Sequence, residues 1–219
     1  MNDVPRIESV NVGKEQTIPG HPKMGGTGIF KAPVAGPVRI DKLEVEGDCV
    51  YDRKHHGGPD QAVYVYLAED YAWWSEQLGQ KIAPGSFGDN IRILGLSSTD
   101  FAIGDRLMIG EVVLEVTAPR IPCNTLAARM ADPQFVKIFR DADRPGAYCR
   151  VIHEGEVAAG MSVVLQPYAG KRIGLVEMYR DWFARKTLDE RRLRETLAAP
   201  IAARARKDWE ELLAAVEGR

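Results

Sequence analysis

The chain has 219 residues and a formal net charge of −2, with 45% hydrophobic and 27% charged residues, an ordinary globular composition. That length allows one sizeable core with a small appendage, and no apolar run is long enough to span a bilayer. The near-neutral charge balance argues against nucleic-acid or membrane partners, which need a clustered positive surface or a polybasic anchor.

Up to about Pro167 the chain alternates short apolar runs with glycine turns, a pattern that predicts strands. Gly110-Glu111 separates two of these runs and predicts a hairpin. Many short strands with frequent turns favour a barrel or a sandwich. The expected strands cover residues 9–12, 28–31, 36–40, 43–45, 61–66, 91–94, 106–109, 112–116, 148–152 and 162–165.

Three helices are expected to interrupt the strands. The first covers residues 69–78 and ends at Gly79, which suits a left-handed cap. The second is short, at 126–130. The third covers 133–140, because Asp132-Pro133 places a capping side chain before a proline at the first helical position.

After Gly170 the pattern becomes helical and predicts three small helices. The first is marked by Leu175, Val176, Tyr179, Trp182 and Phe183. The second opens at the capping-box pattern of residues 187–190, and the third follows Pro200. This tail is too small for a core of its own, so it should pack on the β region or on another subunit, as in a homodimer. We therefore divide the chain into a mainly β domain, residues 1–168, and a three-helix extension, residues 169–219.

The cysteines and the N-terminus predict a cytoplasmic protein. Cys49, Cys123 and Cys149 are odd in number and widely spaced, without a Cys-x-x-Cys pair. Free thiols in a reducing compartment are the simpler interpretation. Residues 1–6 also lack the basic-then-apolar pattern of a signal peptide.

The feature most suggestive of chemistry is the segment from Ala118 to Thr125, with sequence APRIPCNT. A strand runs into Pro119 and Pro122, which hold the backbone extended, and Cys123 then precedes a short helix. The helix start and the nearby Arg120 cation both favour a thiolate, which is the form that attacks electrophiles and binds metals. A lone cysteine is more often buried and inert, but this rigid setting favours a functional thiol.

A second motif is the run from His55 to Asp60, with sequence HHGGPD. Its two glycines permit unusual backbone angles and close approach of a ligand. Neighbouring backbone amides would then cradle an anion, so the functional interpretation is a phosphate or pterin cradle. The alternatives are a His/Asp metal site, whose spacing matches no closed zinc ligand set, and a plain turn before the strand at Gln61.

Two weaker motifs complete the candidates. The loop at residues 84–90 ends in Asn90, which suits either a ligand amide or an Asx turn. Arg144 and Arg150 flank a turn at Gly146, and a guanidinium can grip a phosphate with two donors. For Arg144 we favour an exposed position beside the turn over a role in phosphate binding. Strand alternation puts Tyr148 and Arg150 on one face, with Cys149 and Val151 on the other.

Taken together, these motifs resemble the MOSC domain, which is named for the C-terminal domain of molybdenum-cofactor sulfurase. The helical tail is similar to the three-helix extension of one bacterial branch, the YiiM-like proteins, which includes a reductase of N-hydroxylated purines. The resemblance covers nearly the whole chain, in the segments 27–38, 47–48, 56–60, 87–90, 104–105, 119–123, 146–151 and at Gly160.

The resemblance implies a β-barrel that holds a molybdenum–molybdopterin cofactor, with Cys123 as the metal ligand and catalytic residue. On this basis the expected cofactor-binding residues are His56, Gly57, Gly58, Asp60, Asn90, Arg120 and Arg150. The sequence departs from the family at Asp89, where the family loop usually carries glutamate. The side chain is one methylene shorter, which puts a role for that carboxylate in doubt.

The implied reaction is reduction of N-hydroxylated compounds, either purines or related bases, with detoxification as its use. Removing oxygen from an N–OH group takes two electrons and two protons. Because no amino-acid side chain cycles two electrons easily, a cofactor must supply them. The sequence shows no flavin or haem motif. We therefore expect a separate electron-donor reductase, a flavoprotein, as partner of the small-molecule site.

Two other functions remain open from the sequence. The domain is also suggested to act as a non-catalytic carrier, in which Cys123 bears a persulfide and delivers sulfur or molybdenum cofactor. A thiol enzyme is the third alternative, and it requires the imidazole of His55 or His56 within hydrogen-bond reach of the sulfur. Stoichiometric molybdenum in the purified protein would favour the reductase.

Overall fold

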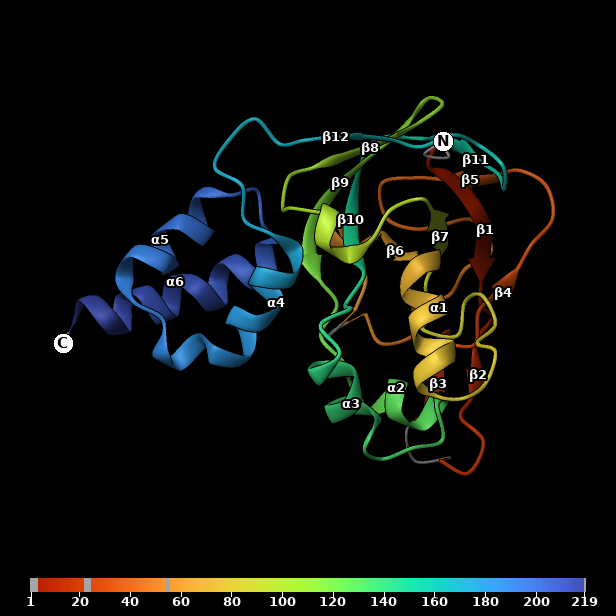
Figure 1. Ribbon diagram of the computed structural model, residues 1–219, viewed down its shortest axis with the longest axis horizontal. Coiled ribbons are helices and arrows are strands. Elements are labelled where there is room, and N and C mark those ends of the chain that lie inside the picture. The colour runs from red at the N-terminus through yellow and green to blue at the C-terminus, as the bar shows by residue number, and fades with distance from the viewer. Residues whose placement is uncertain (1–3, 22–24, 54–55, 219) are drawn as a thin grey trace.

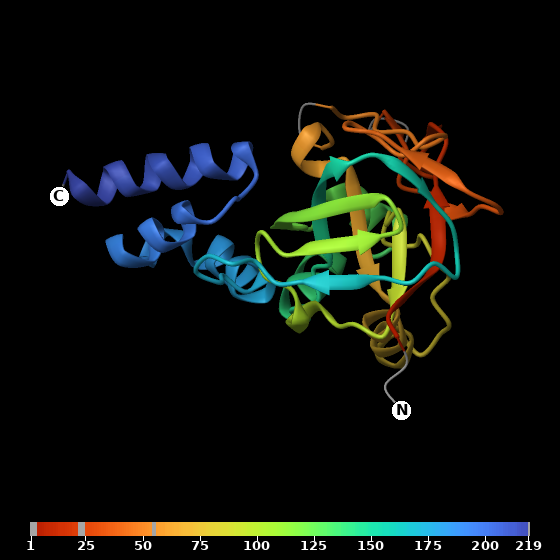
Figure 2. The same ribbon diagram turned by 90° about the horizontal axis from the view of Figure 1, so that it is seen from above.

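The computed structural model describes residues 4–21, 25–53 and 56–218 (Figure 1). Its centre is an eight-stranded, strongly curved sheet (Figure 2), whose strands are antiparallel except for the parallel pair β6–β7. In spatial order these strands are β12 (Val164–Gln166), β8 (Arg106–Ile109), β9 (Val112–Pro119), β10 (Ala147–His153), β6 (Val63–Leu67), β7 (Ile91–Leu94), β1 (Arg6–Val12) and β4 (Ala32–Pro33). The mainly β fold class with added helices is confirmed.

The barrel expected from the resemblance is not closed by a continuous ladder. The edge strands β4 and β12 are not paired with each other. β4 has two residues, and Pro33 lacks the N–H needed to extend the ladder. The curl of the sheet instead brings the segment before β12 against the start of β1. There the Ile7 amide donates to the Met161 carbonyl (2.9 Å), and the Val163 amide donates to the Pro5 carbonyl (2.8 Å).

Several expected elements have different ends. The hairpin of β8 and β9 through Gly110-Glu111 is confirmed. Residues 28–31 form a loop and not a strand. Residues 43–45 contribute only an isolated bridge between Ile40 and Val45. Two small sheets pair β5 (Val38–Ile40) with β11 (Gly155–Val157) and β2 (Gln16–Thr17) with β3 (Gly26–Thr27).

The helices follow their capping signals with small shifts. α1 (Ala68–Gln77) ends at Gly79, whose φ is +63° as a left-handed cap requires. α2 (Asn124–Arg129) is short, as expected. α3 begins at Phe135 and ends at Asp141, later than predicted, because the Asp132 carboxylate accepts from the Gln134 amide (2.8 Å) in a turn.

β6 is buried on both faces and separates two apolar cores. Val63, Val65 and Leu67 face the large core inside the curved sheet. Tyr64 and Tyr66 point the other way, into an aromatic cluster with side chains from α1, α2 and α3. This alternation follows from the two-residue period of a strand. The aromatic cluster carries the candidate site, since Cys123 and Tyr148 pack against its edge.

The tail contains α4 (Leu175–Ala184), α5 (Glu190–Ala198) and α6 (Ala203–Glu217), which lie on one side of the sheet (Figure 1). α5 is capped by Asp189, whose carboxylate accepts from the Arg192 amide (2.8 Å), and not by Thr187. Trp209 of α6 is fully buried in the same core as the sheet. The tail therefore packs on the β region of its own chain. Of the helices in the described part, none has the length and apolar content to cross a membrane.

Candidate functional site

A cavity of about 560 Å³ opens beside the aromatic cluster and is lined by both polar and apolar groups. Its walls come from the segments 26–31, 48–53, 56–57, 61–64, 88–90 and 120–125 and from Tyr148. The volume is within the range of roughly 300–1,000 Å³ seen for small-molecule sites. Of the expected site residues, the structure brings His56, Gly57, Asn90, Arg120 and Cys123 to this cavity.

Cys123 is the reactive group of the cavity. It is the N-cap residue of α2, in extended backbone after the prolines, and is partly buried. Burial disfavours its thiolate, but a hydrogen bond with the His56 side chain, the positive charge of Arg120 and the Leu126 amide outweigh that effect. Together they lower the pKa of the Cys123 thiol to about 6. The thiolate is therefore the main form at neutral pH.

Alkylation of the metal-free protein should report this pKa directly. We expect the rate of Cys123 modification by iodoacetamide to rise with pH to a plateau, with a midpoint near pH 6, because the thiolate is the attacking form. His56→Ala should move the midpoint upward. The measurement is mass spectrometry of the Cys123 peptide across a pH series. Cys49 is the internal control, since burial raises its pKa, and an equal midpoint for both thiols would contradict the assignment.

Arg120 is an almost fully buried cation at the base of the cavity. Its Nη1 donates to the Phe87 carbonyl, and its guanidinium lies over the Tyr64 ring, 4.9 Å from the ring centroid. Its Nε has no hydrogen-bond partner among the described residues. Arg120 therefore brings fixed positive charge and a spare buried donor to the site, which suits an anionic ligand.

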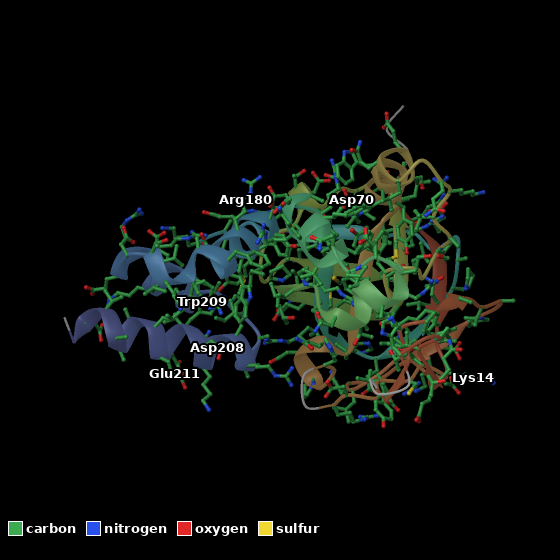
Figure 3. All side chains as sticks on the ribbon, turned by 90° about the horizontal axis from the view of Figure 1, so that it is seen from below. Lys14, Asp70, Arg180, Asp208, Trp209 and Glu211 are labelled. Carbon is green, nitrogen blue, oxygen red and sulfur yellow. The ribbon has the colours of Figure 1, made fainter. Side chains whose placement is uncertain are left out.

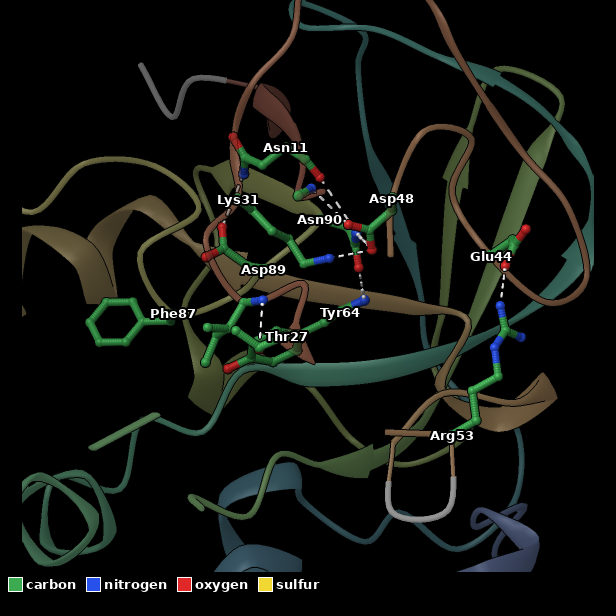
Figure 4. A network of polar contacts seen from close by, with 12 residues as sticks. Asn11, Thr27, Lys31, Glu44, Asp48, Arg53, Tyr64, Phe87, Asp89 and Asn90 are labelled. Atoms are coloured by element: carbon green, nitrogen blue, oxygen red, sulfur yellow. Dashed lines mark hydrogen bonds and ion pairs between the residues drawn. The ribbon is translucent and has the colours of Figure 1, made fainter. Parts of the chain in front are cut away.

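Asn90 belongs to a buried polar network on the cavity wall (Figure 4). Its Oδ1 accepts from the Tyr64 amide (3.0 Å), and its Nδ2 donates to Asp48 (2.9 Å). Asp48 also forms an ion pair with Lys31, whose side chain is only 7% exposed. The pairing compensates the burial of the Lys31 ammonium, which a lysine without a partner rarely tolerates. Asn90 lines the cavity, but its amide is largely occupied in joining strands.

Asp89 lies behind this wall and does not line the cavity. Its fully buried carboxylate accepts from the Asn11 amide (3.1 Å) and from the Tyr71 hydroxyl (2.5 Å). Burial raises the pKa of this carboxyl. The residue therefore supports the loop that carries Asn90 and makes no contact with the cavity.

The glycine turn reaches the cavity only at its start. His56 and Gly57 line it, whereas Gly58 and Asp60 do not. Gly57 and Gly58 have φ of +73° and +85°, which other residues rarely adopt. His55 lies outside the described residues. The turn thus places His56 on the same cavity wall as Cys123, and the residues after Gly57 lie outside the cavity.

Arg150 does not line the cavity, so the sequence expectation placed it wrongly. Its guanidinium pairs with Asp60 (3.0 Å) and Glu115 (3.6 Å), and it donates to the carbonyls of Pro200 and Ile201 (3.2 Å each). Asp60 in turn accepts from the Ala203 amide (2.6 Å) at the start of α6. Arg150 and Asp60 therefore fasten the tail to the sheet.

We expect Arg150→Ala to lower the free energy of unfolding by about 1–3 kcal/mol, because it leaves partly buried acceptors without their donor. It should leave the pH midpoint of Cys123 alkylation unchanged. Urea denaturation and the alkylation series check the two parts. Arg106→Ala is the matched control, since Arg106 also pairs with Glu115 (3.0 Å) but is 45% exposed, and exposed pairs contribute about 0–1 kcal/mol. A shifted alkylation midpoint in Arg150→Ala would show that Arg150 acts on the Cys123 site and does not only hold the tail.

Sequence reasoning missed several lining residues. Cys49, Tyr64 and Tyr148 all face the cavity. Tyr148 is on the outer face of β10, as strand alternation predicts, and the signal for Tyr64 is the same alternation along β6. No local sequence pattern predicts that Cys49 lines the cavity. Its position depends on the close packing of its backbone on Gly28, where a Cβ added to Gly28 would lie 1.9 Å from the Cys49 carbonyl oxygen.

No group of three histidine, cysteine or acidic side chains within the described residues is arranged to hold a metal ion. A metal here would need most of its ligands from a bound organic group, with one thiolate from the protein. That donor set differs from a structural zinc site, which is closed by four protein ligands. A soft thiolate suits a metal also held by sulfur.

Known proteins share this sequence pattern and this fold. The sequence profile of the MOSC domain matches residues 52–164. YflK of Bacillus subtilis is 36% identical over 169 residues, covering 77% of this chain and 76% of YflK. YiiM of Escherichia coli is 32% identical over 155 residues, covering 68% of this chain and 67% of YiiM. A protein named Reductase from Gibberella moniliformis is 31% identical over 146 residues, or 64% of this chain but 26% of that protein.

The crystal structure of YiiM from Geobacillus stearothermophilus superposes with a TM-score of 0.80 at 27% identity, covering 95% of this chain and 99% of that one. The curved sheet, the cysteine-lined cavity and these matches define one class of protein, and the chain belongs to the MOSC domain family. The likeness to YiiM in sequence and over nearly the full structure, tail included, places it in the YiiM-like branch.

Proposed function

We propose that this protein is a molybdenum-cofactor-dependent reductase of N-hydroxylated compounds, with N-hydroxylated purines or related bases as substrates. The observation that carries the proposal is the Cys123 thiolate on the wall of a cavity of about 560 Å³. Membership of the MOSC family and a relative named as a reductase support the same reading.

The residues present fit a molybdenum–molybdopterin group. Cys123 would hold the metal, and the group would supply the two-electron chemistry. The Arg120 guanidinium, with its unpaired Nε, offers charge to an anionic ligand. Arg53 is a further cation of the lining, exposed and paired with Glu44 (2.9 Å). Gly26 and Gly28 also line the cavity, and their lack of a side chain lets Tyr51 and the Cys49 backbone pack closely against them.

The protein's own groups would manage protons. Reduction of an N–OH group consumes two electrons and two protons, leaves an N–H bond and releases water. His56 lines the same cavity as Cys123 and helps to lower the pKa of that thiol, so it is placed to carry a proton at the reacting end. Tyr148 lines the cavity with its phenol protonated, because burial raises its pKa. The electrons would come from a separate flavoprotein reductase in the cytoplasm, since side chains do not cycle them.

Expression in cells that make molybdenum cofactor tests this function. We expect molybdenum close to one per chain and reduction of N6-hydroxyadenine to adenine with a reduced viologen dye as electron source. Molybdenum without any reduction would overturn the enzymatic proposal. A persulfide on Cys123 without molybdenum, seen by mass spectrometry, would support the sulfur carrier instead.

A further inference from the structure

A second, smaller cavity of about 180 Å³ lies between the sheet and the helical tail. On the sheet side its wall is formed by Ala118 and Pro119 at the end of β9 and by Ile121. On the tail side it is formed by Met178 and Trp182 of α4 and by Ala205 and Asp208 of α6. These walls are mainly apolar, and one of them is a flat aromatic ring.

The two cavities are continuous at three residues. His56, Gln61 and Tyr148 line both of them, and Cys123 lines the larger cavity together with His56 and Tyr148. A ligand seated against the tail would therefore end beside the reactive thiolate. The smaller cavity is below the roughly 300–1,000 Å³ of sites for drug-sized ligands, which suits a ligand of one or two rings.

Two polar groups that line the smaller cavity are acceptors without a partner among the described residues. Asp208 is half-buried, and no described residue donates a hydrogen bond to it or pairs with it. The Gln61 Oε1 is buried without a hydrogen-bond partner among the described residues. Arg204 also lines the cavity, but it is exposed and has a contact of its own. Unpaired acceptors on an apolar wall favour a ligand that offers N–H groups from a flat ring.

We propose that the tail completes the substrate site. The ring of an amino-substituted nitrogen heterocycle lies between Pro119 and Trp182, its N–H edge donates to Asp208, and its N–OH group points past Tyr148 toward Cys123. This inference rests on the proposed function and adds to it the residues that select the substrate. Arg150 and Asp60, which fasten the start of α6 to the sheet, act as positioning residues for Asp208.

Calorimetric titration of the full, metal-free chain with adenine tests the site without any need for catalysis. Asp208→Asn should weaken adenine binding about tenfold or more, the usual loss for a hydrogen bond to a charged group. Glu211→Gln is the matched control, because Glu211 is on the same helix (Figure 3) but is exposed and outside the cavity. It should bind adenine within twofold of the unmodified protein.

Filling the cavity gives a second test that does not depend on charge. Ala205→Leu should abolish adenine binding, whereas Ala215→Leu on the exposed face of α6 should not. With loaded enzyme, Asp208→Asn should raise the KM for N6-hydroxyadenine about tenfold relative to the KM for hydroxylamine, which has no ring. Absence of adenine binding to the unmodified chain, or binding unchanged in both Asp208→Asn and Ala205→Leu, would overturn the proposal. Loss of reduction with adenine binding intact would overturn the proposed function alone.

Discussion

Cys123→Ser should lose activity and bound molybdenum by on the order of a hundredfold or more, beyond the 10–100-fold typical of losing a supporting partner of a metal ligand. A serine hydroxyl stays protonated at neutral pH and is a harder ligand than the thiolate that His56 and Arg120 stabilise. The fold should be unaffected, because the side chain is partly exposed at the cavity wall. Metal analysis of protein made in cofactor-competent cells, with a thermal melt, measures both parts.

The other two thiols are the controls for this experiment. Cys49→Ser changes a thiol in the same cavity, but burial raises the pKa of Cys49 and makes it a poorer ligand. Cys149 lies in the large core, so Cys149→Ser should lower only the stability that comes from packing there. Both variants should keep their molybdenum. Full molybdenum in Cys123→Ser, or its loss in Cys49→Ser, would show that Cys123 is not the metal ligand.

Arg120→Ala should lower the free energy of unfolding by roughly 2–4 kcal/mol, from the unpaired Phe87 carbonyl and the lost contact with the Tyr64 ring. It should also raise the pKa of the Cys123 thiol, because the nearby positive charge is gone. Urea denaturation gives the first quantity, and the alkylation midpoint gives the second.

Arg129→Ala provides the comparison for Arg120. Arg129 also lies over an aromatic ring, 4.8 Å from the centroid of Phe30, but it does not line the cavity. Its loss should cost about 1 kcal/mol or less and leave the alkylation midpoint in place. Equal effects of the two substitutions would mean that Arg120 has no special relation to the thiol.

Features that depend on neighbours along the chain could be predicted from the sequence. The Gly110-Glu111 hairpin, the cap at Gly79 and the position of Cys123 at the start of α2 all follow from a few adjacent residues. The boundaries of α3 and α5 were less accurate, because the Asp132 carboxylate accepts from the Gln134 amide in a turn before α3, and Asp189 takes the place of Thr187 as the cap of α5. Such competing local hydrogen bonds differ little in free energy, so a pattern of residue types does not separate them.

The positions of charged side chains needed the tertiary structure. Alternation along β10 correctly put Tyr148 and Arg150 on the same face, yet Tyr148 reaches the cavity and Arg150 reaches the tail. No acidic residue lies next to Lys31 in the sequence, and only the fold brings Asp48 against it. The choice in each case depends on which distant segment packs there, and that is decided by strand pairing and core burial over the whole chain.

The sequence by itself determined the class of fold, the reactive thiol and the presence of a helical tail, because apolar periodicity, prolines and caps act over a few residues. Only the tertiary structure decided that the tail closes over the sheet and brings Trp182 and Asp208 next to the cavity of Cys123. Those contacts join residues far apart in the chain. Their geometry arises from burying Trp209 and its neighbours in a core shared by sheet and tail.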